Sequence, residues 1–126
     1  MKKKFLLLCM AIFSCNIVGA QVLRLSSYES DIYTCANPNN GFIRTSFSIS
    51  HVSCSDSFVI NLNNNTFTWK DYKGQSTNKI YKVQKNEKSI TFATTYNAVR
   101  VTGAVIDIIY YDEGQWYMIT YKCKSN

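Results

Sequence analysis

The chain has 126 residues, with 14 Lys and Arg against 8 Asp and Glu, and a formal net charge of +6. This length predicts a single domain, and no apolar run reaches the ~20 residues of a membrane-spanning helix. The modest positive charge gives no support to nucleic-acid binding.

The first twenty residues have the three parts of a secretory signal peptide. Met1–Lys4 is basic, Phe5–Phe13 is apolar, and Val18–Ala20 supplies small residues at the −3 and −1 positions before Gln21. We therefore predict a leader over residues 1–20.

Cleavage of this leader leaves a single domain over residues 21–126, exported to the periplasm or the extracellular space. Three of the Lys residues leave with the leader, so the remaining domain carries a net charge of +3. In an alternative interpretation, Ile12–Cys15 is a bacterial lipoprotein box, and the protein is lipid-anchored through Cys15.

The first predicted strand is Gln21–Tyr28, and Asp31–Cys35 continues it after a bend. Ala36–Gly41 is a turn cluster with the only Pro of the chain and an Asn-Gly pair, a combination typical of tight hairpins. The longest clean alternation follows in Gly41–His51, and its predicted core face consists of Ile43, Thr45, Phe47, Ile49 and His51.

The central region, Ser57–Thr95, predicts four strands joined by polar turns. Each candidate strand alternates aromatic or β-branched residues with polar ones, which is the pattern of a half-buried antiparallel strand. The predicted strands are Ser57–Leu62, Thr66–Tyr72, Lys79–Lys85 and Ser89–Thr95.

Three further strands are predicted at Ala98–Val101, Val105–Tyr111 and Gln115–Lys122, with a Gly-containing hairpin turn before the last one. The total is about eight strands, without any amphipathic helix. Short turns favour an all-β antiparallel meander that closes into a small barrel, because closure removes exposed edges. A two-sheet β-sandwich is the alternative.

Two stretches, FVINLNNNTFTWKDY (58–72) and IYKVQKNEKSITFAT (80–94), resemble the hairpins of small bacterial lipocalin-like (calycin-type) exported barrels. The resemblance covers about a third of the chain and implies a barrel with a ligand at its mouth. The Gly-x-Trp of true lipocalins is absent, so no ligand residue is carried over.

Three cysteines follow the leader, namely Cys35, Cys54 and Cys123. In an oxidising compartment two of them are expected to pair. We predict Cys35–Cys54, which would flank the Gly41–His51 strand, and a bridge from Cys123 to either of the others stays open.

The sequence contains no catalytic or cofactor motif. His51 with Cys54 is a weak candidate for nucleophilic catalysis. A zinc site made of Cys35, His51, Cys54 and Cys123 lacks the paired C-x-x-C spacing of known patterns. We therefore expect no enzyme activity, catalytic residue, metal or cofactor.

Two charged features have competing interpretations. Asp107 interrupts the apolar run Val105–Tyr111 and points either to solvent or into a barrel lumen. Six lysines form either a docking face for an anionic partner or a solvated outer face that protects strand edges; they are Lys70, Lys73, Lys79, Lys82, Lys85 and Lys88.

The leading functional hypothesis is a monomeric binding protein that holds a small apolar ligand in the barrel mouth, or a partner envelope protein on its loops. Aromatic side chains offer large amphipathic contact areas. The candidate binding residues are Tyr110, Tyr117, Tyr121, Trp116 and Gly103. The alternative is an inhibitor or immunity-type protein that blocks an enzyme through the Tyr96–Ala104 loop.

Overall fold

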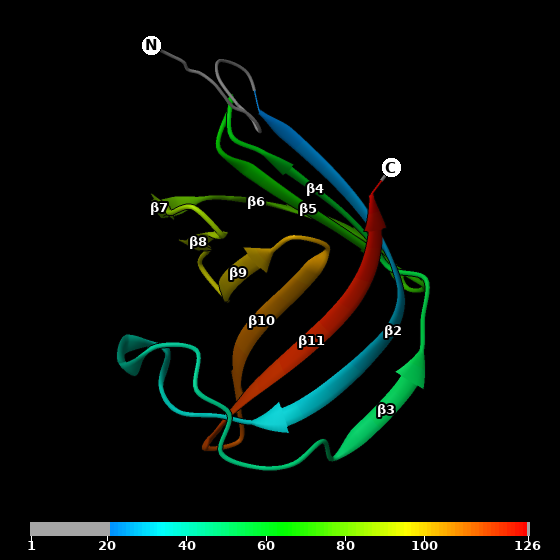
Figure 1. The fold of residues 1–126 in the computed structure, drawn as a ribbon, viewed down its shortest axis with the longest axis vertical. Coiled ribbons are helices and arrows are strands. Elements are labelled where there is room, and N and C mark those ends of the chain that lie inside the picture. Colours follow the sequence, from blue (N-terminus) through cyan, green and yellow to red (C-terminus); the bar gives the residue numbers. More distant parts are fainter. Residues whose placement is uncertain (1–20, 126) are drawn as a thin grey trace, which may run out of the picture.

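The computed structural model describes residues 21–125, which form an all-β antiparallel sheet of ten strands curled into a nearly closed barrel (Figure 1). The strand order is β6-β5-β4-β2-β11-β10-β9-β8-β7, and β3 pairs with β2 outside this path. The strands are β2 (Val22–Thr34), β3 (Ser50–Ser53), β4 (Ser57–Asn61), β5 (Thr66–Asp71), β6 (Gly74–Lys79), β7 (Tyr81–Lys85), β8 (Ser89–Ala93), β9 (Ala98–Thr102), β10 (Val105–Asp112) and β11 (Gln115–Ser125).

The sheet is a meander whose first and last long strands, β2 and β11, pair with each other. Its two ends, β6 and β7, are halves of one bent strand over residues 74–85. The Ile80 N–H donates to the Asn65 carbonyl at 2.8 Å and so extends the pairing of β6 with β5, whereas β7 pairs with β8. When β6 and β7 are counted as one strand and β3 is set aside, the path has eight strands, close to the predicted number. The all-β meander and the barrel are confirmed.

A bulge at Tyr28 divides β2 into two parts. Ser27 pairs with Cys123 and Glu29 with Lys122, so Tyr28 has no partner on β11. An extra residue of this kind bends a strand and shifts its alternation by one. Before the bulge, β2 also pairs with β4, and after it with β3.

The barrel interior is filled by the side chains that the alternation predicts. Phe58 contacts Trp69 and Tyr121, with ring centroids 6.0 and 4.9 Å apart. Phe67 on β5 contacts Phe92 on β8 at 5.4 Å, which joins opposite walls of the barrel. The buried cluster consists of Leu25, Phe58, Ile60, Phe67, Ile80, Phe92, Val99, Val101, Ile106, Ile108, Tyr121 and Cys123.

The strand predicted over Gly41–His51 is wrong. Only its end belongs to β3, and its supposed core residues are exposed: Phe47 is 95% exposed and Ile49 57%. The segment runs irregularly along the second half of β2, where the Ser46 hydroxyl, instead of a backbone carbonyl, accepts the Thr34 N–H at 2.9 Å. Because the barrel strands already fill the interior, this segment has no apolar face to cover there.

The sequence also gave no indication of β6. Its residues Gln75–Asn78 are polar, and most of the strand is exposed at the edge of the sheet. A strand with no buried face lacks the alternation on which prediction depends.

The predicted leader over residues 1–20 and the alternative lipid anchor at Cys15 lie outside the described residues. Between residues 21 and 125, no helix has the length and apolar character needed to cross a membrane.

Two phenylalanines test the packing of the barrel. Phe58 is 1% exposed and Phe47 is 95% exposed, so Phe58→Ala should lower the free energy of unfolding by about 3–5 kcal/mol. Phe47→Ala should change it by less than about 0.5 kcal/mol. Urea denaturation measures both values. If Phe58→Ala does not fold, Phe58→Leu should still show a loss of about 1–2 kcal/mol, and equal values for the two sites would contradict this core.

Candidate binding cleft

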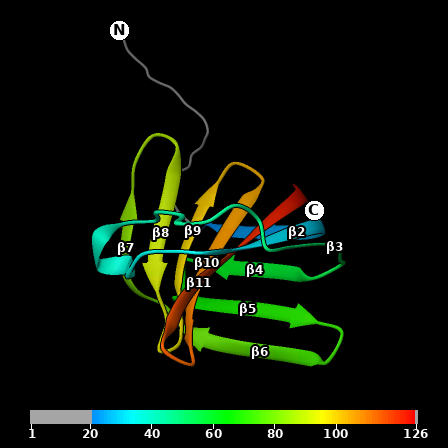
Figure 2. The ribbon, with the colours of Figure 1, turned by 90° about the horizontal axis from the view of Figure 1, so that it is seen from below.

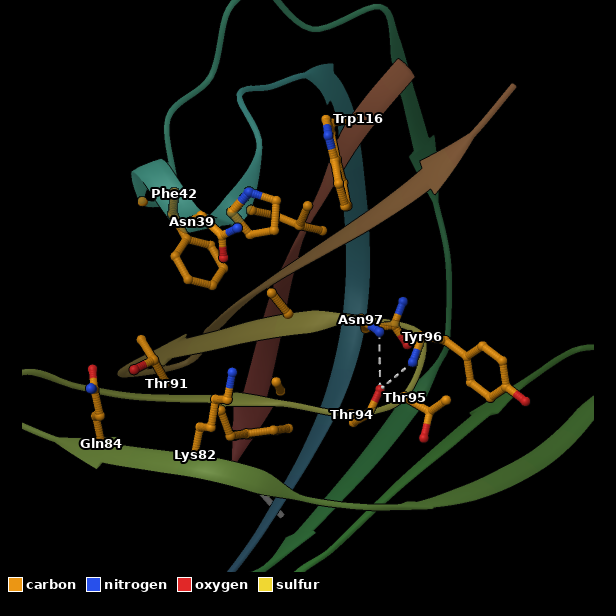
Figure 3. A pocket seen from close by; sticks show the side chains of 16 residues that line it. Asn39, Phe42, Lys82, Gln84, Thr91, Thr94, Thr95, Tyr96, Asn97 and Trp116 are labelled. Carbon is orange, nitrogen blue, oxygen red and sulfur yellow. Dashed lines mark hydrogen bonds between the residues drawn. The ribbon is translucent and has the colours of Figure 1, made fainter. Parts of the chain in front are cut away.

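A cleft of about 620 Å³ lies on the outer face of the sheet, between the turn at residues 38–42 and strands β7–β9 (Figure 3). Its apolar lining includes Pro38, Phe42, Ala93, Ala98, Ile109 and Trp116. Its polar lining includes Asn39, Lys82, Gln84, Thr91, Thr95 and Asn97. Figure 2 shows the turn and the loop that follows it, in teal, crossing in front of the sheet.

Local hydrogen bonds hold the upper wall of the cleft. The Asn37 side chain accepts the N–H of Asn39 at 2.8 Å and caps the 3₁₀ turn η2 (Pro38–Asn40). Gly41 follows with φ of 104°, a conformation that glycine adopts without strain, and its N–H donates to Pro38 O at 3.0 Å. This turn chemistry brings the ring of Phe42 back over the sheet.

A second, smaller core forms beneath the cleft. Ile109 and Met118 are fully buried and paired across β10 and β11. They pack with Cys35, Phe42 and Trp116. Strand β10 is therefore covered on both faces, by the barrel core on one side and by the loop on the other, which explains its run of apolar residues.

Asp107 lies on this outer face, only 2% exposed, at the centre of a hydrogen-bonded network. Arg100 donates to its Oδ2 through Nε at 3.1 Å and Nη2 at 2.8 Å. Thr120 donates to its Oδ1 at 2.6 Å. Arg44, from the covering loop, donates to Thr120 Oγ1 at 2.9 Å and lies 3.7 Å from Asp107. Asp107 thus points neither to solvent nor into the lumen.

The two arginines connect this network to the cleft wall. The Arg100 guanidinium lies 4.8 Å from the centroid of the Phe42 ring, and that of Arg44 lies 4.1 Å from the centroid of Tyr33. Cations in this position are attracted to the aromatic face. The buried carboxylate therefore fixes Arg100, and Arg100 supports Phe42.

The structure does not bring the five predicted binding residues together. Tyr110 and Tyr117 stack at 5.5 Å, half-buried, and burial raises the pKa of Tyr110. Tyr121 is buried in the barrel core, where burial and Asp56 raise its pKa. Gly103 lies in the exposed turn between β9 and β10. Of the five, Trp116 lines the cleft.

A second pocket, of about 670 Å³, opens at the barrel mouth beside Trp69 and Tyr121. Its two carboxylates, Asp56 and Asp71, and the indole of Trp69 are already used by the fold. Trp69 Nε1 donates to Asp56 Oδ2 at 2.9 Å, and Asp56 also helps to raise the pKa of Tyr121. Asp71 Oδ1 accepts the N–H of Lys73 at 2.8 Å.

The predicted Cys35–Cys54 disulfide is wrong, because Cys35, Cys54 and Cys123 are all free thiols. The Cys54 N–H donates to the Tyr28 carbonyl at 3.2 Å, so Cys54 lies beside the bulge of β2. Cys35 follows the far end of that strand, about 20 Å away at the rise of an extended chain. A disulfide needs Cα atoms within about 7 Å. Cys123 lies in the barrel core.

His51 lies exposed on β3, with its ring between two carboxylates. Nδ1 is 2.9 Å from Asp31 Oδ1 and Nε2 is 3.2 Å from Glu29 Oε2. Hydrogen bonds from Ser48 and His51 lower the pKa of Asp31. Over residues 21–125, no group of three or more His, Cys, Asp or Glu side chains is placed to hold a metal ion.

Sequence reasoning missed most of the cleft. The sequence predicts a turn at Asn39, a strand at Phe42 and a loop at Asn97, and nothing in it places the three together. Lys82 and Gln84 belong to a predicted strand, but the bulge in β7 that precedes Gln84 has no signal in the sequence. The Pro-Asn-Asn-Gly cluster at 38–41 is the single signal that marks this wall.

No protein-family model matches the chain, and searches of curated proteins and of solved structures find no match. The geometry of the cleft is therefore the basis for the proposed function.

Thiol modification tests whether the three cysteines are free. Burial raises the pKa of Cys35 and raises that of Cys123 to about 11, so few thiolates form at these two sites at pH 8. In the native protein, N-ethylmaleimide should modify the half-buried Cys54 first, and in denaturant it should modify all three. Mass spectrometry of protein purified without reductant follows the modification. A mass lower by two hydrogens, with a peptide joining Cys35 to Cys54, would restore the disulfide.

Removing the Asp107 charge should loosen the covering loop. Asp107→Asn leaves Arg100 without its ionic partner. Because both arginines keep solvent contact, we expect a loss of about 2–3 kcal/mol in stability, less than for a fully buried pair. Amide hydrogen exchange should also accelerate at Thr45 and Ile49, which bond to β2. Asp112→Asn, at the exposed end of β10, is the control, and equal exchange in both variants would refute the anchoring role.

Proposed function

We propose that this chain is a non-enzymatic binding protein that holds a small molecule in the cleft beneath Phe42. The observation that supports this most directly is the combination of an apolar floor with a polar rim on the outer face of the sheet. Because side chains fill the barrel interior, a ligand would bind on the outer surface or at the mouth.

The size of the cleft suits a small molecule. Its volume of about 620 Å³ lies within the ~300–1,000 Å³ of small-molecule sites, which combine apolar lining with a few convergent polar groups. Phe42 and Trp116 come from separate parts of the chain and line the same cleft. Figure 3 shows both rings on the upper side, opposite Thr91 and Lys82.

The cleft is a better candidate than the barrel mouth. At the mouth, Asp56 and Asp71 are engaged in hydrogen bonds that hold the fold. At the cleft, the side-chain amides of Asn39, Gln84 and Asn97 make no hydrogen bond within the described part of the chain. Polar groups without internal partners are free to bind a ligand.

The lining favours binding over catalysis. Among the described residues that line the cleft, the ionisable side chains are Lys82 and Tyr96. General acid–base or nucleophilic catalysis needs a second titratable group within hydrogen-bond reach, and Figure 3 shows the Tyr96 ring pointing away from Lys82. The proposal includes export of the domain through the leader predicted over residues 1–20.

A second candidate function is docking to a partner protein, as an inhibitor would do. The Tyr96–Ala104 segment, which was the loop expected to block an enzyme, is mostly β9. It lies inside the sheet, where its backbone pairs with β8 and β10. The loop along β2 is more suitable, because Phe47, Ile49 and Val52 are all exposed. Exposed apolar side chains grouped in this way are typical of interaction surfaces.

Native mass spectrometry of protein purified from its producing cells, with NMR mapping of a fragment library, tests the two candidates. We expect a copurifying small molecule, or fragment-induced shifts at the Trp116 indole. Phe42→Ala with Trp116→Ala should abolish this binding, and Phe47→Ala should leave it unchanged. A stoichiometric protein partner lost in Phe47→Ala would support the docking function, and fragment shifts only around Trp69 would place the site at the mouth.

A further inference from the structure

We propose that the ligand of the cleft is a hydroxyl-rich molecule with a negative charge, an acidic sugar or short acidic glycan. Its ring would pack against Phe42 and Trp116, and its acidic group would pair with Lys82. This inference rests on the proposed function, since it assumes that the cleft is the binding site.

The polar lining matches hydroxyl groups. The amides of Asn39, Gln84 and Asn97 each offer two N–H donors and a carbonyl acceptor, and Thr91 contributes a hydroxyl. Within residues 21–125, none of these side-chain groups is hydrogen-bonded to the protein. A sugar hydroxyl both donates and accepts, so it replaces the water that these groups lose. A purely apolar ligand would form no hydrogen bond with any of them.

The apolar lining suits the other face of a sugar ring. Phe42 and Trp116 are both half-buried, so part of each ring stays available to a ligand. The C–H faces of a pyranose pack on aromatic rings, while its hydroxyls point sideways to polar groups. Ring platforms surrounded by amides therefore favour a sugar over a fatty chain.

The charge of the lining indicates an acidic ligand. Lys82 is its single cationic group, and no carboxylate is among the described residues that line the cleft. An amine ligand would find no counter-charge there, whereas a carboxylate on the sugar would gain an ion pair.

The backbone at Lys82 is an independent observation. Lys82 has a φ of 55°, within a bulge of β7 between Tyr81 and Gln84. This left-handed conformation is strained for any residue with a Cβ, and glycine would adopt it freely. The other non-glycine residues with positive φ in the described chain, Asn65 and Glu113, lie in hairpin turns that require it. A β-bulge accommodates a residue in this conformation and re-aims the side chains beside it, and bulges are over-represented next to functional sites.

Lys82→Gly separates binding from folding. The substitution relieves the backbone strain, so the midpoint of urea unfolding should stay equal or rise. Asn65→Gly is the matched control, because it relieves a similar φ of 57° in the turn between β4 and β5, away from the cleft.

An array of oligosaccharides tests the ligand class, with uronic- or sialic-acid glycans next to neutral ones of equal length, followed by calorimetric and NMR titration of the hits. We expect acidic glycans to bind at least fivefold tighter than the neutral ones and to shift the Trp116 indole signal. Lys82→Gly should remove this difference, and Asn65→Gly should retain it.

Three outcomes would overturn the inference. If dodecanol shifts the Trp116 signal and no glycan does, the cleft is a binding site but its ligand is apolar. If neither probe affects the cleft, the proposed function fails as well. If acidic glycans bind equally well to Lys82→Gly, they are held elsewhere, for example by the exposed Lys70 or Lys88.

Discussion

Closure of the barrel is the constraint on which the rest of this structure depends. The pairing of β2 with β11 joins the two halves of the meander, and the bent strand over residues 74–85 joins its far ends. The enclosed space is filled by large side chains, and Phe67 reaches Phe92 across the interior. Every further apolar group has to find cover on the outside. The second core under the loop and the cleft beside it are consequences of this limit.

On the outer face of the sheet, one buried carboxylate holds the covering loop in place. Asp107 is almost fully buried and is neutralised by Arg100 and Arg44, which belong to the sheet and to the covering loop. Buried ion pairs add little net stability but are costly to break. Here the pairing fixes the position of the loop and, through Arg100, that of the Phe42 ring. An apolar residue in place of Asp107 would leave both arginines without this partner.

Alternation along the strands was sufficient to predict much of the barrel core, because Phe58, Phe67 and Phe92 each lie on a strand with one mainly buried face. The same rule failed at Gly41–His51, where the pattern is as regular but no interior space is left. The Cys35–Cys54 pairing failed because it depends on the path of β2. Of the candidate site, Trp116 was predicted, whereas the conformation of Lys82 and the partners of Asp107 arise only in the folded sheet.

The bent strand couples the core to the surface. Ile80, at its corner, is buried in the barrel, and two residues later the chain reaches Lys82 on the cleft wall. A substitution that repacks the core around Ile80 therefore also moves the wall opposite Phe42, although it touches no ligand. Ligand preference in such a protein can diverge through changes in the core, with every residue of the cleft lining conserved.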